Sequence, residues 1–442
     1  MKTINELISK YNTSAPRYTS YPPLPFWKNA PNQDTWFSHL ASKSEDGVDL
    51  YVHIPYCEKL CWYCGCNRVI TKDHSVEEKL IELLSLEWNL YEKSIGPLKV
   101  NSLHLGGGTP TFLSPKNLKK LISALTKNKS DNFIGSIEVD PRTCTLDHLK
   151  TLKELGFQRI SLGIQDFDQR VQKSINRYQP VSLVKSLVDH IRALDFESIN
   201  FDLIYGLPNQ TIESVQDTIK IVNELNPDLI AFYGYAHLPS KISNQKLIRS
   251  DELPTPELRQ KLYETGKELL TSSGLVDIGM DHFAKETNYL CLAKMNGNLH
   301  RNFMGYTDKK SKCLIGLGPS AISDSGLSFI QNQKEFSLYQ QALEAGDLPY
   351  SIGHIQSESD LIAQKHILTL MCQEKVKISS ELENLLTVTR ELEDLANDGL
   401  LTITQQTIKL TETGKLFMRN VASCFDHHLR QQKTGVRFSQ TV

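Results

Sequence analysis

Short apolar runs alternate with amphipathic stretches of helical period from residue 48 to residue 273. The predicted strands are 48–54, 101–106, 135–140, 159–164, 198–206 and 228–234. The predicted helices are 75–93, 115–127, 146–155, 168–175, 181–194, 212–225 and 255–273. Strands that alternate with helices predict a parallel sheet. Six such units predict an α/β fold built on a closed or partly closed parallel barrel, and of these we favour a partial (β/α)6-type barrel.

The N-terminal segment, residues 1–45, lacks this repeat and predicts an arm packed on the barrel. Its centre, RYTSYPPLPFW, is rich in prolines and aromatic residues. Prolines oppose a regular helix, so we expect an extended segment lying over the main body. A functional alternative is that the arm covers the active site.

The last hundred or so residues change character again. Helices are predicted at 357–371 and 379–397, followed by a strand, a turn, a strand and a further helix. The pattern resembles a winged helix within a mainly helical domain at 341–442, which leaves 46–340 for the catalytic barrel. Because the chain has no basic excess, we expect this domain to cover one mouth of the barrel rather than to bind DNA.

Composition narrows the functional class. The 442 residues carry a net charge of −2, which gives no sign of bulk nucleic-acid binding. No apolar run reaches the ~18 residues of a membrane helix, and the N-terminal MKTINELISK has no apolar signal core. We therefore expect a cytoplasmic protein in a reducing compartment, with neither nucleic acid nor membrane as partner.

Four cysteines fall within the ten residues CEKLCWYCGC. Cys57, Cys61 and Cys64 have the spacing C-x3-C-x2-C, and Cys66 follows two places on. Three thiolates can bind three irons of a 4Fe–4S cluster, whose fourth iron then takes another ligand. This arrangement is typical of the radical S-adenosylmethionine (SAM) enzymes, in which methionine chelates the open iron.

Other interpretations of the cysteines stay open. A structural zinc site usually pairs its ligands twice, but no second C-x2-C pair occurs in the chain. A disulfide framework suits a short secreted chain. Reduced structural thiols are the third alternative. Cys66 is either a spare thiol near the cluster or a fourth ligand, and we favour the spare.

Candidate binding residues follow the predicted strands, at the edge where parallel barrels carry their active sites. The second strand leads into GGGTPT, residues 106–111, whose glycines let backbone N–H groups approach and bind a carboxylate. Later strands are followed by Glu138, Gln165, Asp202 and the loop 234–240. Each residue alone is more often a strand-end hydrogen-bonding group. Their recurrence at one level of successive strands favours a site for a ribose or an amino group, and Arg177 offers a bidentate fork for a carboxylate.

Eight motifs spread over nearly the whole chain carry a family resemblance: YVHIPYCEKLCWYCGC, LGGGTPT, SIEVDPR, LGIQDFD, FDLIYGLP, YAHLP, GMDHFA and LHRNFMGYT. Together with the RYTSYPP arm and the C-terminal RNVASCFD segment, the chain resembles the oxygen-independent coproporphyrinogen III oxidases. The related haem chaperones share the cysteine motif but typically lack the arm.

The resemblance implies an activity in haem biosynthesis. Two propionate side chains of coproporphyrinogen III lose CO2 and become vinyl groups, which gives protoporphyrinogen IX. Each step consumes one SAM, which the reduced cluster cleaves to a 5′-deoxyadenosyl radical that removes a hydrogen from the propionate β-carbon. The implied cofactors are one 4Fe–4S cluster, held by Cys57, Cys61 and Cys64, and two SAM molecules per active site.

Residue roles carry over by motif in the same way. The SAM on the open iron is expected to contact Tyr51, Tyr63, Gly107, Glu138 and Ile322. The second SAM is expected to contact Gly108, Thr109, Gln165, Arg177, Asp202 and Ala236. Cys66 matches a family cysteine that is required without being a ligand, so we assign catalytic roles to Cys66 and Tyr51.

The substrate and the partners are less well defined by the sequence. Four substrate carboxylates need cationic contacts, for which Arg17, Lys241 and Arg301 are candidates. The loop 300–307 is a candidate substrate cover, although His300 is equally well read as a packed histidine. The resemblance suggests a monomer, and a reductant such as flavodoxin or ferredoxin is expected.

Three alternative functions differ in class. A haem chaperone of the same superfamily would bind haem tightly without turnover. A zinc or iron–sulfur regulator would use the C-terminal part to bind DNA, which the near-neutral charge argues against. A radical SAM enzyme acting on another substrate can be separated from the main hypothesis only by an assay.

Overall fold

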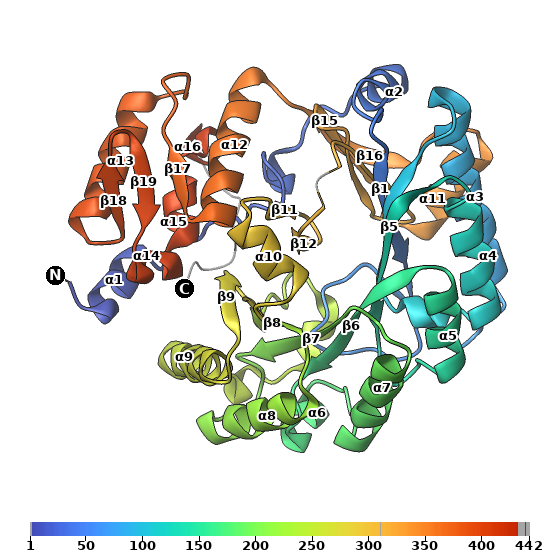
Figure 1. The fold of residues 1–442 in the computed structure, drawn as a ribbon, viewed down its shortest axis with the longest axis horizontal. Helices are drawn as coiled ribbons and strands as arrows, with labels where there is room; N and C mark the ends of the chain where they lie inside the picture. The colour runs from blue at the N-terminus through green and yellow to red at the C-terminus, as the bar shows by residue number, and fades with distance from the viewer. Residues whose placement is uncertain (1, 310, 432–437, 439–442) are drawn as a thin grey trace.

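Six parallel strands form the centre of the fold (Figure 1). The computed structural model describes residues 2–309, 311–431 and 438. The six strands are β1 (Val48–Ile54), β4 (Val100–Gly107), β5 (Lys129–Val139), β6 (Phe157–Gln165), β7 (Ser198–Tyr205) and β8 (Leu229–Gly234). They pair in this order, each parallel to the next. The predicted strands and their parallel pairing are therefore confirmed.

Strands that the pattern did not predict extend this sheet on both sides. Beside β1 lie β13 (Leu314–Leu317), which is parallel to it, and the antiparallel β14 (Ile322–Asp324), β15 (Ser328–Asn332) and β16 (Tyr350–Ile355). Beside β8 lie the antiparallel β10 (His282–Ala284) and β9 (Val276–Gly279). Within the described residues, the end strands β16 and β9 do not pair. The barrel is thus partial, as predicted.

The helices of the β-α units cover the outside of the sheet (Figure 1). They are α3 (Val76–Ile95), α4 (Pro115–Leu125), α5 (Leu146–Glu154), α6 (Gln169–Ser174), α7 (Val181–Ala193), α8 (Ile212–Leu225) and α9 (Pro256–Ser272). Side-chain caps explain several starts: Ser114, Thr145 and Thr211 each accept a hydrogen bond from the backbone N–H three residues on. One continuous apolar core fills the space between these helices and the strands.

The N-terminal segment contains two helices that the arm prediction lacked, α1 (Ile4–Tyr11) and α2 (Gln33–Ala41). Both lie outside the proline-rich stretch, where nothing opposes helix formation. Trp36 is fully buried in the core of the large sheet, whereas Tyr18 and Tyr21 belong to the core of the C-terminal part. The segment therefore packs against two bodies, not the barrel alone.

The C-terminal part begins later than residue 340. That position falls inside α11 (Phe336–Glu344), and β16 after it still belongs to the large sheet. Beyond it lie α12 (Glu358–Gln373), β17 (Lys375–Lys377), α13 (Leu385–Asn397), β18 (Leu401–Thr404), β19 (Thr407–Leu410), α14 (Glu412–Leu416), α15 (Met418–Ser423) and α16 (His427–Gln431). The helix predicted from residue 379 starts only at Leu385, because Asn384 has a left-handed backbone with φ 59°.

Three small elements complete the site region: β2 (Tyr56–Cys57), β3 (Val69–Ile70) and a hairpin of β11 (His300–Asn302) and β12 (Gly305–Thr307). The short helix α10 (Tyr289–Met295) precedes the hairpin. Among the described helices, none is both long and apolar enough to cross a bilayer.

Candidate active site

The cysteine loop leaves the C-terminal end of β1, the edge at which parallel barrels carry their chemistry. Cys57 and Cys61 are buried, Cys64 is half-buried and Cys66 is exposed. The nine cysteines are all free thiols. A loop that presents three thiols at graded depth can hold a group at the barrel mouth.

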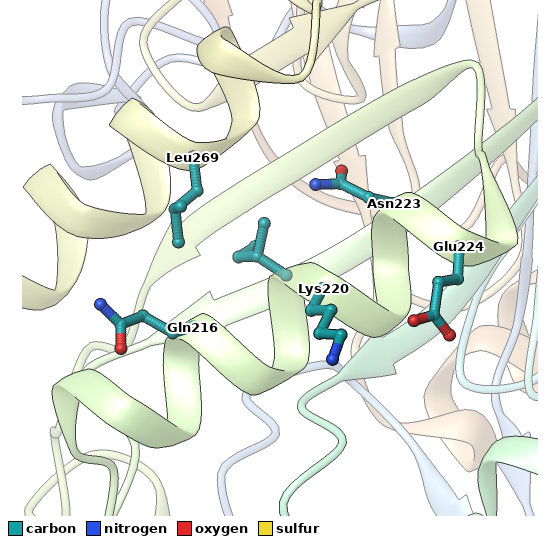
Figure 2. Close-up of a pocket in the computed structure, with 6 residues that line it drawn as sticks. Gln216, Lys220, Asn223, Glu224 and Leu269 are labelled. Atoms are coloured by element: carbon teal, nitrogen blue, oxygen red, sulfur yellow. The ribbon is translucent and has the colours of Figure 1, made fainter.

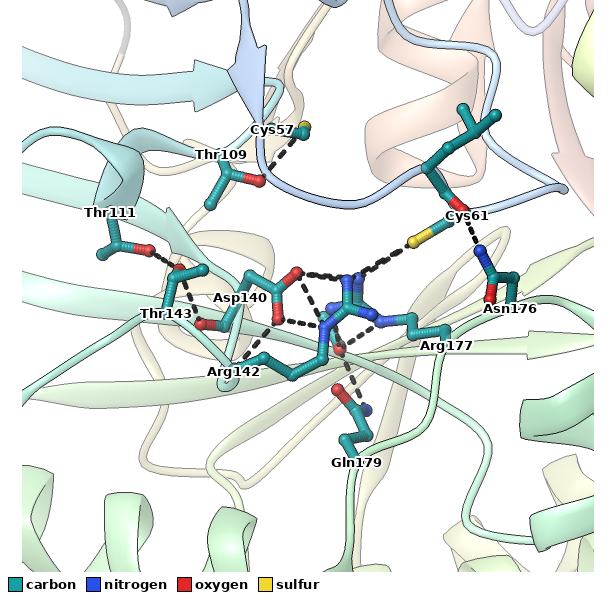
Figure 3. A network of polar contacts seen from close by, with 12 residues as sticks. Cys57, Cys61, Thr109, Thr111, Asp140, Arg142, Thr143, Asn176, Arg177 and Gln179 are labelled. Atoms are coloured by element: carbon teal, nitrogen blue, oxygen red, sulfur yellow. Dashed lines mark hydrogen bonds and ion pairs between the residues drawn. The ribbon is translucent and has the colours of Figure 1, made fainter. Parts of the chain in front are cut away.

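Hydrogen-bond donors and positive charge surround two of the sulfurs (Figure 3). The Thr109 hydroxyl donates to Cys57 Sγ over 3.2 Å. Arg177 Nη1 and Arg142 Nη2 lie 3.4 and 3.5 Å from Cys61 Sγ. Donors of this kind stabilise a thiolate over a thiol. This end of the site is therefore suited to thiolates and to a negatively charged group bound through them.

Asp140 holds both arginines in place (Figure 3). Its Oδ2 lies 2.6 Å from Arg142 Nη2 and 3.1 Å from Arg177 Nη1. Burial alone would raise the pKa of Asp140, but the Arg177 charge and the hydrogen bonds and charge of Arg142 outweigh it and lower that pKa. Asp140 and Arg142 were not among the predicted site residues, although SIEVDPR contains both.

The guanidinium of Arg177 also contacts the backbone of β6. The remaining donors, Nε and Nη2, both reach the Gly163 carbonyl oxygen, at 3.2 and 2.6 Å. The carboxylate beside Arg177 is thus that of Asp140, and the Arg177 side chain is 7% exposed. In the described structure, Arg177 links β6 to the cysteine loop.

The glycine run after β4 passes directly beside the cysteines. Gly107 N donates to Glu138 Oε2 over 3.2 Å, and Gly108 N donates to the Ile54 carbonyl over 2.7 Å. A Cβ at Gly107 would lie 2.6 Å from His53 Nδ1, and its φ of +106° disfavours any side chain. A Cβ at Gly108 would lie 3.1 Å from Cys57 Sγ. Only glycine allows the backbone to approach here.

An aromatic group lines the β1 side of the site. His53 Nε2 lies 2.7 Å from the Asn67 carbonyl and must donate to it, so its Nδ1 accepts from the Tyr51 hydroxyl at 3.1 Å. Burial lowers the pKa of His53, which favours this neutral form. The Tyr51 ring stacks on His104 and meets Phe303 of the β11–β12 hairpin edge-on at 5.0 Å. The hairpin therefore reaches the β1 side of the barrel.

Asp202 and Gln165 lie on the neighbouring strands. Asp202 accepts hydrogen bonds of 2.8 Å from both Ser161 Oγ and Asn200 Nδ2. Burial, with the nearby charge of Glu138, raises the pKa of Asp202 to about 6. Gln165 ends β6 in a left-handed conformation with φ 69°, which redirects its side chain at a bulge in the ladder.

The remaining predicted contacts lie on different elements. Gln245 donates to the backbone carbonyls of Tyr63 and Ala236 over 2.9 and 3.1 Å, which ties the cysteine loop to the loop after β8. The Ile322 backbone packs against Gly316, and Gly316 is paired with Tyr51 across the sheet. Ile322 therefore comes to the site through β14, an element that the pattern did not predict.

Cationic side chains gather on the β8–β10 side. Arg17 pairs with Asp281, and its guanidinium lies 5.9 Å from the centre of the Tyr233 ring. Arg301 is 4% exposed and donates weakly to the Arg17 carbonyl at 3.4 Å, while its Nε and Nη1 have no hydrogen-bond partner among the described residues. Lys241 is exposed. Of the three predicted cations, two therefore lie together.

The chain is similar to known proteins over almost its whole length. The Radical SAM superfamily model matches residues 51–222. The oxygen-independent coproporphyrinogen III oxidase of Escherichia coli (strain K12) is 39% identical, over 99% of this chain and 98% of that protein. The chain belongs to the oxygen-independent coproporphyrinogen III oxidase family. The oxidase of Helicobacter pylori (strain J99) is 36% identical, with full coverage of both chains.

The similarity to this family extends to the three-dimensional fold. The solved structure of Escherichia coli coproporphyrinogen III oxidase (HemN), described as a radical SAM enzyme, matches with a TM-score of 0.89 and 36% identity. The match covers 96% of this chain and 98% of that one. The radical SAM family implies a 4Fe–4S cluster and SAM. Three thiols that are closely spaced in the sequence, two of them with hydrogen-bond donors in the structure, fit that cluster.

One surface hollow lies on the outer helices rather than at the cysteine loop. It has a volume of about 500 Å³ and lies between α8 and α9, lined by Gln216, Ile219, Lys220, Asn223, Glu224 and Leu269 (Figure 2). None of these residues contacts the cysteine loop or the glycine run. The hollow is therefore a groove between outer helices and not the active site.

Proposed function

We propose that this protein is an oxygen-independent coproporphyrinogen III oxidase, which converts two propionate side chains of coproporphyrinogen III to vinyl groups and gives protoporphyrinogen IX. One observation carries the proposal. A three-cysteine loop with cationic and hydroxyl donors on its sulfurs faces a side-chain-free glycine run, in a chain of this family matched over 99% of its length.

The proposed cofactor roles are those that the family motifs imply. Cys57, Cys61 and Cys64 hold a 4Fe–4S cluster. When bound, the cluster and SAM supply the electron and the carbon radical that begin the oxidation. The proposed contacts of the SAM at the open iron are Tyr51, Tyr63, Gly107, Glu138 and Ile322. A second SAM is proposed to contact Gly108, Thr109, Gln165, Arg177, Asp202 and Ala236.

The cationic group on the β8–β10 side supplies contacts for the substrate carboxylates. Arg301 offers two donors, Nε and Nη1, that no described residue accepts. A buried guanidinium with unmet donors is costly, and a bound carboxylate supplies the missing acceptors. The Arg17 guanidinium lies nearby, shared with Asp281. The β11–β12 hairpin connects this group to Tyr51 through Phe303 and is proposed to cover the macrocycle.

Cys66 and Tyr51 complete the proposed catalytic residues. The Cys66 thiol is exposed where the cysteine loop ends, and the Tyr51 hydroxyl is fixed by its bond to His53. The proposal also includes a small electron-transfer protein such as flavodoxin or ferredoxin as reductant, a monomeric state and a cytoplasmic location. In it, residues 1–45 and the C-terminal part close over the barrel.

An anaerobic turnover assay tests the function. The reconstituted protein would receive coproporphyrinogen III, SAM, a strong reductant and cell extract as electron acceptor, with protoporphyrin and 5′-deoxyadenosine counted together. We expect both products from the wild type, neither from Cys61→Ser, and unchanged yields from Cys144→Ser, whose thiol lies outside the motif.

Two outcomes would contradict the proposal in different ways. Deoxyadenosine without protoporphyrin would retain the radical chemistry and discard this substrate. Neither product from protein with an intact cluster, together with tight haem binding, would favour the haem chaperone.

A further inference from the structure

Three histidines surround one buried carboxylate, that of Asp360, on elements other than those that carry the cysteine loop. His428 Nε2 lies 2.6 Å and His427 Nε2 3.2 Å from Asp360 Oδ1, while His354 Nε2 lies 3.0 Å from Oδ2. The Asp360 side chain is 3% exposed. The nitrogen and oxygen atoms of His354, Asp360 and His428 all lie within 4.8 Å of one another.

These groups come from three separate segments. His354 lies on β16, Asp360 lies in the first turn of α12, and His427 and His428 begin α16. Asp360 also accepts the backbone N–H of Ser357 at 2.9 Å, which fixes the carboxylate at the start of the helix. The position of the carboxylate is therefore set by the backbone.

Tyr21 of the N-terminal segment is hydrogen-bonded to His427. The Tyr21 hydroxyl accepts the backbone N–H of His427 at 3.2 Å and lies 3.0 Å from its Nδ1. A hydroxyl that donates to Nδ1 leaves the His427 hydrogen on Nε2, where it faces the acceptor-only carboxylate of Asp360. This is the outer contact that commonly orients a metal-ligating carboxylate.

His354 and His428 are not fixed in this way. Each presents Nε2 to Asp360, and no hydrogen bond to either Nδ1 is found among the described residues that would set the tautomer. Aromatic rings enclose the group, with Phe26 stacked on His428 at 5.7 Å.

We propose that His354, Asp360 and His428 bind a zinc ion, with His427 as the residue that positions the carboxylate. Two imidazoles and one carboxylate form an accepted ligand set for Zn²⁺, which leaves one coordination position open. Calcium and magnesium prefer oxygen ligands, so the two imidazoles select against them. The ion joins β16, α12 and α16, and through His427 it touches Tyr21 of the N-terminal segment.

Metal counting on the holoenzyme tests the site. Anaerobically purified protein would be incubated with zinc chloride, desalted, and analysed for zinc and iron by mass spectrometry. We expect about one zinc per chain in the wild type. We expect it to be lost in His354→Ala with His428→Ala, while the iron count stays unchanged. His190→Ala on α7 is the matched control and should retain the zinc.

Two further variants separate ligation from folding and from hydrogen bonding. His428→Gln retains an N–H donor for Asp360 but offers only a poor zinc ligand, so it should fold like the wild type and hold no zinc. His427→Ala should retain the zinc with an affinity weaker by about 10- to 100-fold in competition with a chelating dye. Wild-type protein that holds no more zinc than His428→Gln would overturn the proposal and leave a purely hydrogen-bonded cluster.

Discussion

Two arginines share one carboxylate beside the sulfur of Cys61. Arg142 and Arg177 both contact Asp140 and both reach Cys61 Sγ. Net charge and hydrogen bonds to the sulfurs tune the potential of an iron–sulfur cluster. The arrangement therefore favours the reduced, more negative cluster, the state that must deliver an electron.

Removing one of these charges should change the potential in a known direction. Arg142→Met deletes a donor and a positive charge, so we expect the cluster potential to fall by about 60 mV, the value for a tenfold change in a one-electron equilibrium. Anaerobic redox titration followed by electron paramagnetic resonance measures it. Arg170→Met, on the exposed side of α6, is the control. An unchanged potential in Arg142→Met would show that Arg142 serves only to hold Asp140.

The raised pKa of Asp202 predicts a pH dependence of SAM use. Because its folded-state pKa is about 6, Asp202 is ionised above that pH and becomes protonated as the pH falls through it. In its proposed role, Asp202 accepts hydrogen bonds from the second SAM, and this capacity should fall with protonation. We expect 5′-deoxyadenosine formation to decline below about pH 6 in the wild type.

Asp202→Asn provides the matching control for that profile. The amide keeps the shape of the carboxylate but does not titrate, so the acidic limb of the pH profile should be flatter in the variant. The rate of 5′-deoxyadenosine formation should also fall by roughly tenfold, which corresponds to a loss of about 1.4 kcal/mol of hydrogen bonding. A wild-type limb that persists unchanged in the variant would assign the titration to another group.

At the scale of elements, one buried carboxylate ties the edge of the sheet to its covering helix. Glu87 of α3 accepts hydrogen bonds from Gly318 N, Asn332 Nδ2 and the Tyr339 hydroxyl at 2.8, 2.6 and 2.5 Å. Burial raises its pKa to about 7, against the opposing effect of those donors. The helix, the end of β13, β15 and α11 therefore meet at one group.

Glu87 should make stability fall as the pH rises. The folded pKa of about 7 exceeds the unfolded value of 4.5. Between these values the unfolded chain releases the proton first, so the free energy of unfolding decreases as pH increases and then levels off. In Glu87→Gln the amide NH2 group faces hydrogen-bond donors, so the free energy of unfolding should fall by about 1–3 kcal/mol.

Thermal unfolding of the two proteins across pH 5 to 8 measures both effects. We expect the difference in melting temperature between wild type and Glu87→Gln to shrink as the pH rises. Glu82→Gln, on the exposed face of the same helix, should match the wild type throughout. A difference that grows with pH would contradict the assignment.

The sequence predicted those elements whose periodicity is local and strong. Six strands and the helices between them alternate cleanly, so their existence and order could be predicted. The strands β13 to β16 are short, and their pairing joins residues far apart in the chain, so no local pattern revealed them. Ile322 was assigned by family motif alone, without any element to place it.

In the site, too, the features formed by neighbouring residues were predicted, and the contacts between distant residues were not. The cysteine spacing and the glycine run are contiguous, and the structure brings them together. The contacts of Asp140 with Arg177 and of Arg17 with Asp281 join distant residues. Arg177 is buried, and a buried guanidinium needs a carboxylate partner, which Asp140 supplies. Such long-range pairs leave no local pattern in the sequence.

At the scale of the whole molecule, the N-terminal segment places the cation of Arg17 on the β8–β10 side of the barrel. Arg17 lies beside Arg301, and burial, together with the charge of Arg17, lowers the pKa of Arg419 to about 10. These three guanidiniums gather near Asp281 and form a local positive excess. Such an excess suits a substrate with four carboxylates.

Arg17→Ala should therefore affect the porphyrinogen and spare the SAM. We expect KM for coproporphyrinogen III to rise by roughly 10-fold, as for loss of about 1.4 kcal/mol of charge-assisted binding, with kcat less affected. SAM binding in the absence of substrate should not change. Arg249→Ala, whose side chain is exposed, is the control, and an equal rise in KM for SAM would refute a role confined to the substrate.

The contact between the two chain ends has a consequence for biosynthesis. Tyr18 donates to Asp426, a residue 408 positions later, and Tyr21 packs in the same C-terminal core. A ribosome has therefore released almost the whole polypeptide before the first segment finds its partner. The contact between the two ends is therefore among the last to form, and the strand that carries the cysteine loop is synthesised long before that contact can exist.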